Sequence, residues 1–394
     1  MTTSTPKQGL QFNFQIPTNI VFGTGSLDGI DAHVKELGVK KPLLVTDKVV
    51  GQSEGVKRAL ARLKESGIPA VVWDGISAEP TGESIREGIR RYRAGGCDGL
   101  IGFGGGSSMD CAKAIGVLAV AGGDDATAFV AKGGTRQVQG CPPIIAVPTT
   151  SGTGSEVTAV SVVINQSTNY KLPIRHPSLM PRVAIVDPSL MLSMPRGVTI
   201  STGVDALSHA TECFTLVREH PFADTLALQA IELIAGNLKR AAEKGDDIVA
   251  RTNMALAATM AGTAFNIGGL QFHTHAQVLG GRYRVPHGIT CGIALRAGLH
   301  YILPTATGKL ARLCRAFGID TSGLSTAQAA ERGVEAVAKL LDALEVPTVT
   351  EVAPLTEADI PSLVQETMDT SSRPLSHEAA VGIWEEMFRQ PKRS

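Results

Sequence analysis

Four residues of metal-ligand type make up the most specific chemical pattern in this sequence. Asp205 and His209 are four residues apart, and His273 and His287 follow further along the chain. On a helix, residues four apart project from one face, so one helix could present the first pair together. One carboxylate and three imidazoles suit a divalent transition metal such as Fe²⁺ or Zn²⁺. A single histidine is more often a satisfied core or surface residue, but four such positions together favour a metal site.

A glycine-rich turn upstream could bind a pyrophosphate. It follows an apolar strand pattern, precedes a helical one, and consists of Gly104, Gly105, Gly106 and Ser107. Glycine lets a backbone approach phosphate closely, and the first N–H groups of the next helix stabilise its charge. The turn matches neither Gly-x-Gly-x-x-Gly nor a P-loop, so alone it is equally consistent with a tight connection. A second hydroxyl-rich loop at 148–156 also follows a strand pattern, and the pair favours a crevice for an extended ligand.

Asp47 directly follows the predicted strand 42–46. A carboxylate at that place can accept hydrogen bonds from a ribose 2′-hydroxyl and would repel a 2′-phosphate, which predicts NAD in preference to NADP. An aspartate that caps a turn or a helix is an equally common interpretation.

The residue pattern of the sequence changes near residues 188–198. Before this segment, short apolar strand patterns alternate with helical spacing, which predicts right-handed βαβ units and a parallel sheet. Further β-rich segments follow at 158–165 and 182–187, and beyond them long Ala/Leu/Glu-rich helical patterns dominate. We therefore expect an α/β dinucleotide-binding domain over residues 1–190 and an all-helical metal-binding domain over residues 191–394.

Composition excludes several kinds of partner. The 394 residues carry a formal net charge of +0, which offers no electrostatic attraction for nucleic acid or an anionic membrane surface. The longest bland apolar run, 114–121, is too short to span a bilayer, and the N-terminus lacks an apolar signal core. The six cysteines include no Cys-x-x-Cys pair and are typical of buried thiols in a reducing compartment. We expect a cytoplasmic protein.

Taken together, four segments resemble the iron-dependent (group III) alcohol dehydrogenases. They are Gly-Gly-Gly-Ser-Ser-Met-Asp-Cys-Ala-Lys (104–113), Pro-Thr-Thr-Ser-Gly-Thr-Gly-Ser-Glu-Val-Thr (148–158), Asp-Ala-Leu-Ser-His-Ala-Thr-Glu (205–212) and the His-to-Pro-His-Gly segment 273–288. The resemblance runs in order from Phe22-Gly23 to His287-Gly288, which is most of the chain. It implies a dehydroquinate-synthase-like architecture, in which an α/β domain with a parallel sheet precedes a helical domain and a cleft separates them.

The resemblance also implies site residues and ligands. The metal ligands would be Asp205, His209, His273 and His287, for Fe²⁺ or another divalent ion such as Zn²⁺. NAD would contact Asp47, Gly104, Gly105, Gly106, Ser107, Asp110, Thr149, Thr150, Thr158, Lys171 and Leu190. The substrate would be a small alcohol or aldehyde, and family members commonly form dimers or larger homo-oligomers.

The sequence departs from the family at one position near the metal. Many members carry a histidine four residues after the third ligand, where this chain has Gln277. One helical turn after His273, Gln277 should still face the metal, whereas His275 should point roughly 200° away around the axis. An amide does not titrate near neutral pH. Gln277 is therefore expected to shape substrate binding, and His275 becomes the candidate proton relay only if the helix register differs.

The expected reaction is a hydride transfer between NAD(H) and an alcohol/aldehyde or ketone pair, with the metal polarising the substrate oxygen. Two related readings stay open at this stage. A maleylacetate-reductase-like enzyme shares a Val-Leu-Gly-Gly segment like 278–281, but generally lacks this ligand set. A lyase of the dehydroquinate-synthase type would use NAD and metal without net redox change. A binding protein without catalysis is disfavoured, because an intact ligand set is costly to keep unused.

Overall fold

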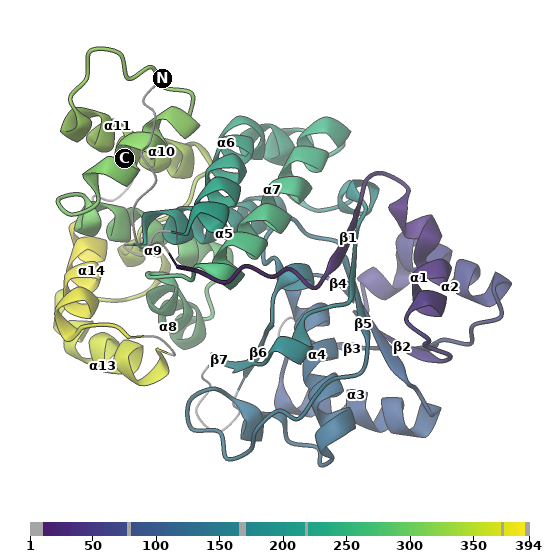
Figure 1. The fold of residues 1–394 in the computed structure, drawn as a ribbon. Coiled ribbons are helices and arrows are strands. Elements are labelled where there is room, and N and C mark those ends of the chain that lie inside the picture. The colour runs from purple at the N-terminus through teal and green to yellow at the C-terminus, as the bar shows by residue number, and fades with distance from the viewer. Residues whose placement is uncertain (1–10, 77–79, 165–170, 217–219, 372–373, 391–394) are drawn as a thin grey trace.

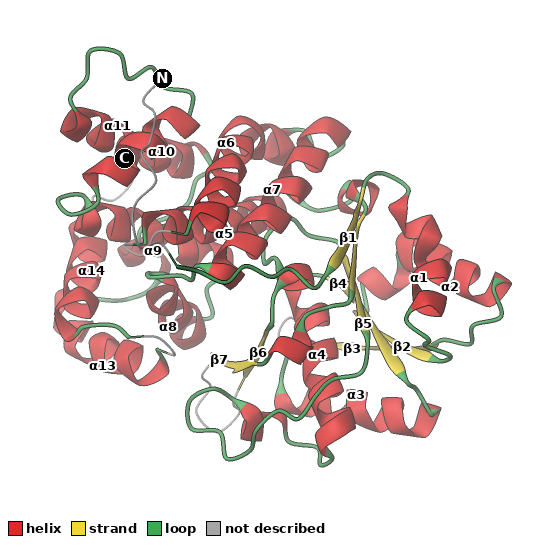
Figure 2. Ribbon diagram, viewed as in Figure 1, coloured by secondary structure: helices red, strands yellow, loops and turns green. Residues whose placement is uncertain are grey.

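The computed structural model describes residues 11–76, 80–164, 171–216, 220–371 and 374–390. These residues form an α/β half and a helical half that lie side by side (Figures 1 and 2). The described elements therefore have the two-part architecture expected from the alternation of strand and helix patterns and their later loss.

Within the described residues, six strands form one parallel sheet in the order β1-β8-β5-β4-β2-β3. Their bounds are β1 (Asn19–Phe22), β2 (Pro42–Asp47), β3 (Val71–Ile76), β4 (Gly99–Gly104), β5 (Ile144–Pro148) and β8 (Val183–Val186). The helices of this half are α1 (Ile30–Glu36), α2 (Glu54–Glu65), α3 (Gly82–Gly95) and α4 (Gly106–Ala121). Both faces of the sheet are covered, which explains why its strands are almost wholly apolar.

Alternate side chains of one strand enter different cores. Leu43 of β2 packs in the cluster that α3 and α4 complete, through residues such as Ile89 and Ile115. Leu44 points to the other face and packs with residues of α1 and α2. The period of two along β2 therefore fixes which pair of helices covers each face of the sheet.

Two strand features differ from the sequence-based expectation. The β-rich segment 158–165 contains β6 (Val160–Ile164), which pairs antiparallel with β7 (Lys171–Arg175) in a separate hairpin. Residue 165, the end of the predicted segment, lies outside the described residues. The edge strand β1 was not predicted; it has only four residues, and its burial is partial.

The helical half is built around α5. Its helices are α5 (Arg196–Thr215), α6 (Pro221–Glu243), α7 (Ile248–Ile267), α8 (His273–Tyr283), α9 (His287–Ile302), α10 (Thr307–Ala316), α11 (Thr326–Ala343), α12 (Val349–Val352), α13 (Ile360–Thr370) and α14 (His377–Arg389). Fifteen residues of α5 are buried, on all sides of the helix. A helix buried all round lies inside a bundle, and α6, α7 and α9 surround α5 here.

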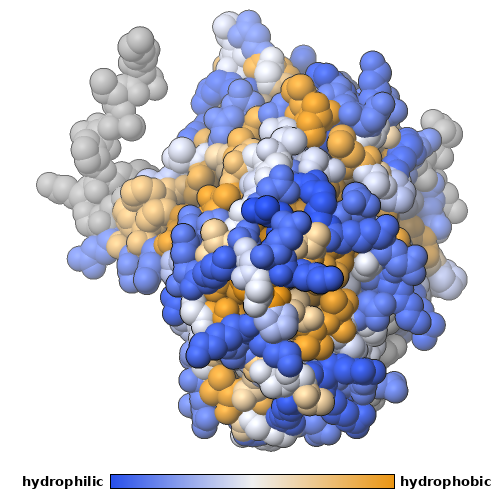
Figure 3. Space-filling model, turned by 90° about the vertical axis from the view of Figure 1, so that its right-hand side faces the viewer, coloured by the Kyte–Doolittle hydropathy of each residue, from blue (hydrophilic) through white to orange (hydrophobic). Residues whose placement is uncertain are grey.

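The last sheet strand ends at Val186, and the first long helix begins at Arg196. We propose that the two domains meet between these points, as the change in residue pattern near residues 188–198 suggested. Hydrophilic residues cover most of the face drawn in Figure 3, with smaller apolar areas between them. None of the helices in the described part of the chain combines the length and the apolar character that a bilayer crossing requires.

Candidate active site

One cleft, with a volume of about 2350 Å³, brings together residues from both halves of the molecule. Its lining includes ten of the eleven positions predicted to contact the nucleotide: Asp47, Gly105, Gly106, Ser107, Asp110, Thr149, Thr150, Thr158, Lys171 and Leu190. The four predicted metal ligands and Gln277 line the same cleft. Gly104 and His275 are not part of its lining, although Gly104 directly precedes the lining residue Gly105.

The glycine turn joins β4 to α4 at the cleft. Gly104 has φ 145°, a left-handed value that side-chain-bearing residues rarely adopt, and a Cβ there would collide with the side chain of Ser108. The backbone N–H of Thr149 donates to the Gly104 carbonyl at 2.9 Å, which ties the second loop to the first. The first turn of α4, a helix of 16 residues, therefore opens into the cleft with the polarity that favours an anion.

Asp47 serves a turn as well as lining the cleft. Its Oδ1 accepts hydrogen bonds from the N–H groups of Val49 and Val50, at 2.8 and 2.9 Å. These bonds fix the orientation of the carboxylate at the end of β2. The capping interpretation of Asp47 is thus correct in the structure, and it is compatible with contact to a ribose.

Asp110 and the buried Lys113 hold the second loop against α4. Asp110 accepts hydrogen bonds from Ser155 Oγ at 2.6 Å and from the Val162 N–H at 2.9 Å. The Lys113 ammonium, wholly buried, donates to the carbonyl oxygens of Ser155 and Thr158 at 2.7 and 2.9 Å. These contacts brace the loop that carries Thr158.

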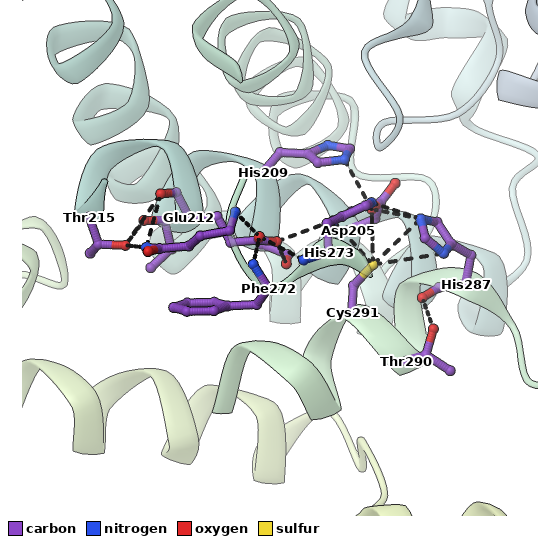
Figure 4. A network of polar contacts seen from close by, with 12 residues as sticks. Asp205, His209, Glu212, Thr215, Phe272, His273, His287, Thr290 and Cys291 are labelled. Atoms are coloured by element: carbon purple, nitrogen blue, oxygen red, sulfur yellow. Dashed lines mark hydrogen bonds and ion pairs between the residues drawn. The ribbon is translucent and has the colours of Figure 1, made fainter. Parts of the chain in front are cut away.

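Three helices bring the metal-ligand candidates together. Asp205 and His209 lie one turn apart on α5, His273 is the first residue of α8, and His287 is the first residue of α9 (Figure 4). Proline at 286 sits immediately before α9, where a helix tolerates its missing N–H. Gly288 packs so tightly on the backbone of Ser201 that no Cβ would fit. That contact holds the start of α9 against α5.

The donor atoms of these residues have the separations that a small cation requires. The Asp205 Oδ1 atom lies 3.3 Å from His209 Nε2, 4.0 Å from His273 Nε2 and 3.8 Å from His287 Nε2. The Nε2 atoms of His273 and His287 are 3.0 Å apart. Bonds of about 2.0–2.1 Å in tetrahedral geometry place donors about 3.3–3.4 Å apart. The residues therefore fit a divalent metal.

The pKa shifts of Asp205, His209 and His287 favour the protonation states that bind a metal. Burial raises the pKa of Asp205, but the three neighbouring imidazoles outweigh that effect, so the pKa lies below its usual value and the group is a carboxylate. Burial lowers the pKa of His287 to about 3 and also lowers the pKa of His209. Neutral imidazole is the form that binds metal.

Sequence reasoning missed Glu212, the wholly buried carboxylate behind His273. Its Oε1 lies 3.1 Å from His273 Nδ1 and accepts a hydrogen bond from Ser208 Oγ at 2.7 Å. Burial opposes ionisation of Glu212, but the bond to His273 holds its pKa below the usual value. A carboxylate on Nδ1 fixes the tautomer that leaves Nε2 free for metal. The sequence could have indicated this residue, because Glu212 ends the motif 205–212 and follows His209 by three residues, which is within one helical turn.

Cys291, on α9, was also missed. Its Sγ lies 3.4 Å from Asp205 Oδ1, and the thiol is wholly buried. Donor atoms of Asp205, His273, His287 and Cys291 all lie within 4.8 Å of one another. The scattered cysteines gave no Cys-x-x-Cys signal, but the spacing of four residues from His287 could have indicated a shared helix face.

Gln277 and His275 leave α8 on different sides. Gln277 lines the cleft, as its spacing from His273 suggested. His275 is wholly buried, its Nε2 lies 3.4 Å from the Ala380 carbonyl, and its ring lies 5.6 Å from that of Trp384. Burial lowers the pKa of His275 to about 4. The geometry therefore disfavours His275 as a proton relay to the cleft.

Family models match both halves of this chain. Residues 17–188 match the model described as iron-containing alcohol dehydrogenase, and residues 199–383 match the C-terminal model of the same family. The chain belongs to the iron-containing alcohol dehydrogenase family. This assignment confirms the resemblance and the expected dehydroquinate-synthase-like architecture. It makes the chain a metal-dependent oxidoreductase, and it favours neither the maleylacetate-reductase-like reading nor the lyase reading.

Named relatives and solved structures agree with this assignment. The choline dehydrogenase of Bacillus subtilis (strain 168) is 39% identical over 339 residues, which are 86% of this chain and 84% of that protein. The NAD-dependent methanol dehydrogenase of Bacillus methanolicus is 38% identical over 329 residues, 82% of this chain and 85% of that protein. A crystal structure of 1,3-propanediol oxidoreductase superposes with a TM-score of 0.89 at 33% identity, covering 96% of this chain and 100% of that chain.

Proposed function

We propose that this chain transfers hydride between NAD(H) and a small primary alcohol/aldehyde pair, with a divalent metal held by Asp205, His209, His273 and His287. One observation carries the proposal: the Asp/His cluster and both nucleotide-type loops line a single cleft. A relative named as NAD-dependent supports the choice of cofactor. Iron is the metal that the family descriptions name, although the same donors suit zinc.

The α/β half supplies the nucleotide contacts. The first turn of α4 offers backbone N–H groups and a favourable dipole to the pyrophosphate. The Asp47 carboxylate, oriented by its bonds to Val49 and Val50, meets a ribose at the end of β2. Leu190 also lines the cleft. We place the adenosine beside Asp47 and the nicotinamide toward the metal cluster.

The helical half supplies the chemistry at the other end. A bound divalent metal would polarise the substrate oxygen and lower the pKa of its hydroxyl. His287 and His209 stay neutral on account of burial, and Asp205 stays ionised, so these three donors are in their metal-binding forms at neutral pH. Gln277 presents an amide to the cleft and would hydrogen bond to substrate without titrating.

The named relatives suggest the substrate class. Choline, methanol and 1,3-propanediol, which their names contain, are all small molecules with a primary hydroxyl group. We propose that the substrate shares this group. The remainder of the substrate is selected by cleft residues beyond the metal cluster, among them Phe265 and Leu270.

A metal analysis combined with an NAD-coupled screen of primary alcohols tests this function. We expect one divalent ion per chain and NADH formation, and we expect both to be lost in the Asp205→Ala and His287→Ala variants. The loss of turnover should be about a thousandfold or more, because several kcal/mol of charge stabilisation disappear. His300→Ala is a matched control, because His300 lies at the exposed end of the same helix as His287. Full metal content and activity in His287→Ala would overturn the assignment.

The proposal also covers the cellular location and the oligomeric state of the protein. All six cysteines are free, which supports the proposed cytoplasmic location because reducing compartments keep thiols unpaired. The proposed homo-oligomer, a dimer or larger, rests on the family resemblance, and light scattering of the purified chain tests it.

A further inference from the structure

We propose that the primary alcohol oxidised by this chain carries an extended apolar tail of about six to ten carbons. The tail lies in a part of the cleft, here called the distal arm, that is lined by Leu216, Leu270, Phe272, Tyr301 and Ile302. The inference rests on the proposed function, because the hydroxyl end of the substrate lies at the metal cluster. It deepens that function by naming the remainder of the substrate.

The cleft is larger than a site for one ligand needs to be. Its volume of about 2350 Å³ exceeds the roughly 300–1,000 Å³ of a pocket for one drug-sized ligand. The positions proposed to contact NAD all lie between residues 47 and 190, whereas the distal arm is formed by residues 216–302 of the helical half. The distal arm therefore adds space that the nucleotide positions do not account for.

Two helices run side by side from the metal cluster toward the distal arm. Near the cluster, Gly288 at the start of α9 packs on Ser201 of α5. Further along both helices, the Cys291 sulfur lies 3.4 Å from Asp205 Oδ1. Residue numbers rise together along the two helices, so α5 and α9 run in the same direction. Their C-terminal ends therefore lie on the same side of the metal cluster.

The far ends of these two helices give the length of the distal arm. At 1.5 Å per helical residue, Leu216 lies about 16 Å beyond Asp205, and Ile302 lies about 22 Å beyond His287. The Lys309 ammonium donates to the Leu216 carbonyl at 2.7 Å, and Lys309 belongs to α10, which directly follows α9. The two far ends therefore lie near each other, and because both line the cleft, the cleft extends well beyond the metal cluster.

The segment before α8 forms a wall between the metal cluster and the far end. Phe272 directly precedes the third metal ligand, and its ring packs so closely on Gly298 of α9 that a Cβ there would lie 2.4 Å from it. The Gln271 amide donates to Thr215 Oγ1 at 2.7 Å, which holds this segment along α5. Figure 4 shows Thr215 and His287 at opposite ends of the polar network, with Phe272 between them.

The chemistry of the distal arm suits an alkyl chain. Its five lining residues offer four apolar side chains and one phenol, and Ala379 and Ile383 of α14 line the cleft as well. Such walls stabilise buried methylene groups but give few partners to a polar substrate. An extended chain advances by about 1.3 Å per carbon–carbon bond, so six to ten carbons cover about 8–13 Å. That length fits within the distance from Asp205 to Leu216.

A chain-length series tests the proposal on the metal-loaded full chain with NAD. We expect kcat/KM to rise about three- to fourfold per methylene group, and by about a hundredfold or more from 1-propanol to 1-octanol. The rise should come mainly from KM, because the tail binds equally in the ground state and the transition state. The ether 5-ethoxypentan-1-ol matches 1-octanol in length. Its buried oxygen should lower kcat/KM about tenfold relative to 1-octanol.

Variants of Leu270 test the location of the tail. In Leu270→Trp the larger ring would fill the distal arm, so the ratio of kcat/KM for 1-octanol to that for 1-propanol should fall about tenfold or more. Ile267→Trp is the matched control, because Ile267 is a partly buried residue at the end of α7 that does not line the cleft. Leu270→Asn, with Ile267→Asn as its control, adds a polar group without bulk and should lower the same ratio if Leu270→Trp fails to fold.

The outcomes separate this inference from the proposed function. Oxidation of short primary alcohols with a flat or falling chain-length profile overturns the apolar tail and leaves the proposed function intact. A metal-loaded chain that forms no NADH from any primary alcohol overturns both. A rising profile that the Leu270 variants and their Ile267 controls change alike overturns the placement of the tail in the distal arm.

Discussion

The Glu212 carboxylate binds His273 twice, through the side-chain Nδ1 at 3.1 Å and through the backbone N–H at 2.9 Å. Its Oε2 also accepts hydrogen bonds from the backbone N–H groups of Gln271 and Phe272. One buried carboxylate thus satisfies donors at the start of α8 and orients the imidazole that α8 presents to the metal site. The position of His273 depends on both roles together.

We predict that Glu212→Gln weakens metal binding by about 10–100-fold, the usual cost of removing the outer partner of a ligand histidine. The amide oxygen can still accept hydrogen bonds, but the NH₂ group would face backbone N–H donors, with which it cannot pair. Competition with a chromophoric chelator measures the affinity. Glu335→Gln, at an exposed residue of α11, is the control, and equal affinities of the two variants would refute the prediction.

Cofactor choice should depend on Asp47. We predict that the wild type prefers NAD, because the carboxylate at the end of β2 would repel a 2′-phosphate. Asp47→Asn keeps an oxygen that can accept from Val49 and removes the charge, so the ratio of kcat/KM for NADP to that for NAD should rise by about tenfold or more. A wild-type preference for NADP would sink this idea.

Local sequence patterns were enough to predict the buried parallel strands and the helix that carries Asp205 and His209. The buried parallel strands are short apolar runs, and the spacing of Asp205 and His209 shows on its own that they share a helix face. The β6–β7 hairpin was harder to predict, because Pro173 interrupts the strand pattern of β7 and the pairing is not part of the parallel sheet. The edge strand β1 is too short to give a periodic signal.

The surroundings of the metal cluster could not be predicted in the same way. Glu212 and Cys291 approach His273 from α5 and α9, across sequence separations of 61 and 18 residues. Such contacts arise from the packing of three helices, and no periodicity in one helix encodes them. Residue spacing alone gives the direction in which a side chain leaves a single helix. For that reason Gln277 and His275 could be assigned to different sides of α8 from the sequence.

The buried Glu156 should make folding stability depend on pH. Burial raises the pKa of this carboxyl, and Thr259 Oγ1 donates to its Oε1 at 2.9 Å. The folded state therefore keeps the proton after the unfolded state has released it, so the free energy of unfolding falls as pH rises from the unfolded pKa through the folded one. Glu156→Gln should remove this contribution.

Urea unfolding between about pH 5 and pH 8 measures the effect. The midpoint of Glu156→Gln should match that of the wild type most closely at the acidic end and exceed it increasingly as pH rises. Glu83→Gln, at an exposed position in the first turn of α3, should follow the wild type throughout. A constant offset between wild type and Glu156→Gln at all pH values would mean that Glu156 is ionised in the fold.

Gln277 offers a test of proton transfer at the substrate end of the cleft. Its side chain lines the cleft one turn after His273, and an amide has no proton to exchange near neutral pH. We predict that Gln277→His adds an ionisation to the pH profile of kcat/KM near the ordinary imidazole value of about 6.5. His275→Asn should lower stability but leave the shape of that profile unchanged, because His275 packs against Trp384 and the Ala380 carbonyl. A silent Gln277→His together with an altered profile in His275→Asn would show instead that the proton passes through His275, and that α8 turns a different face to the cleft.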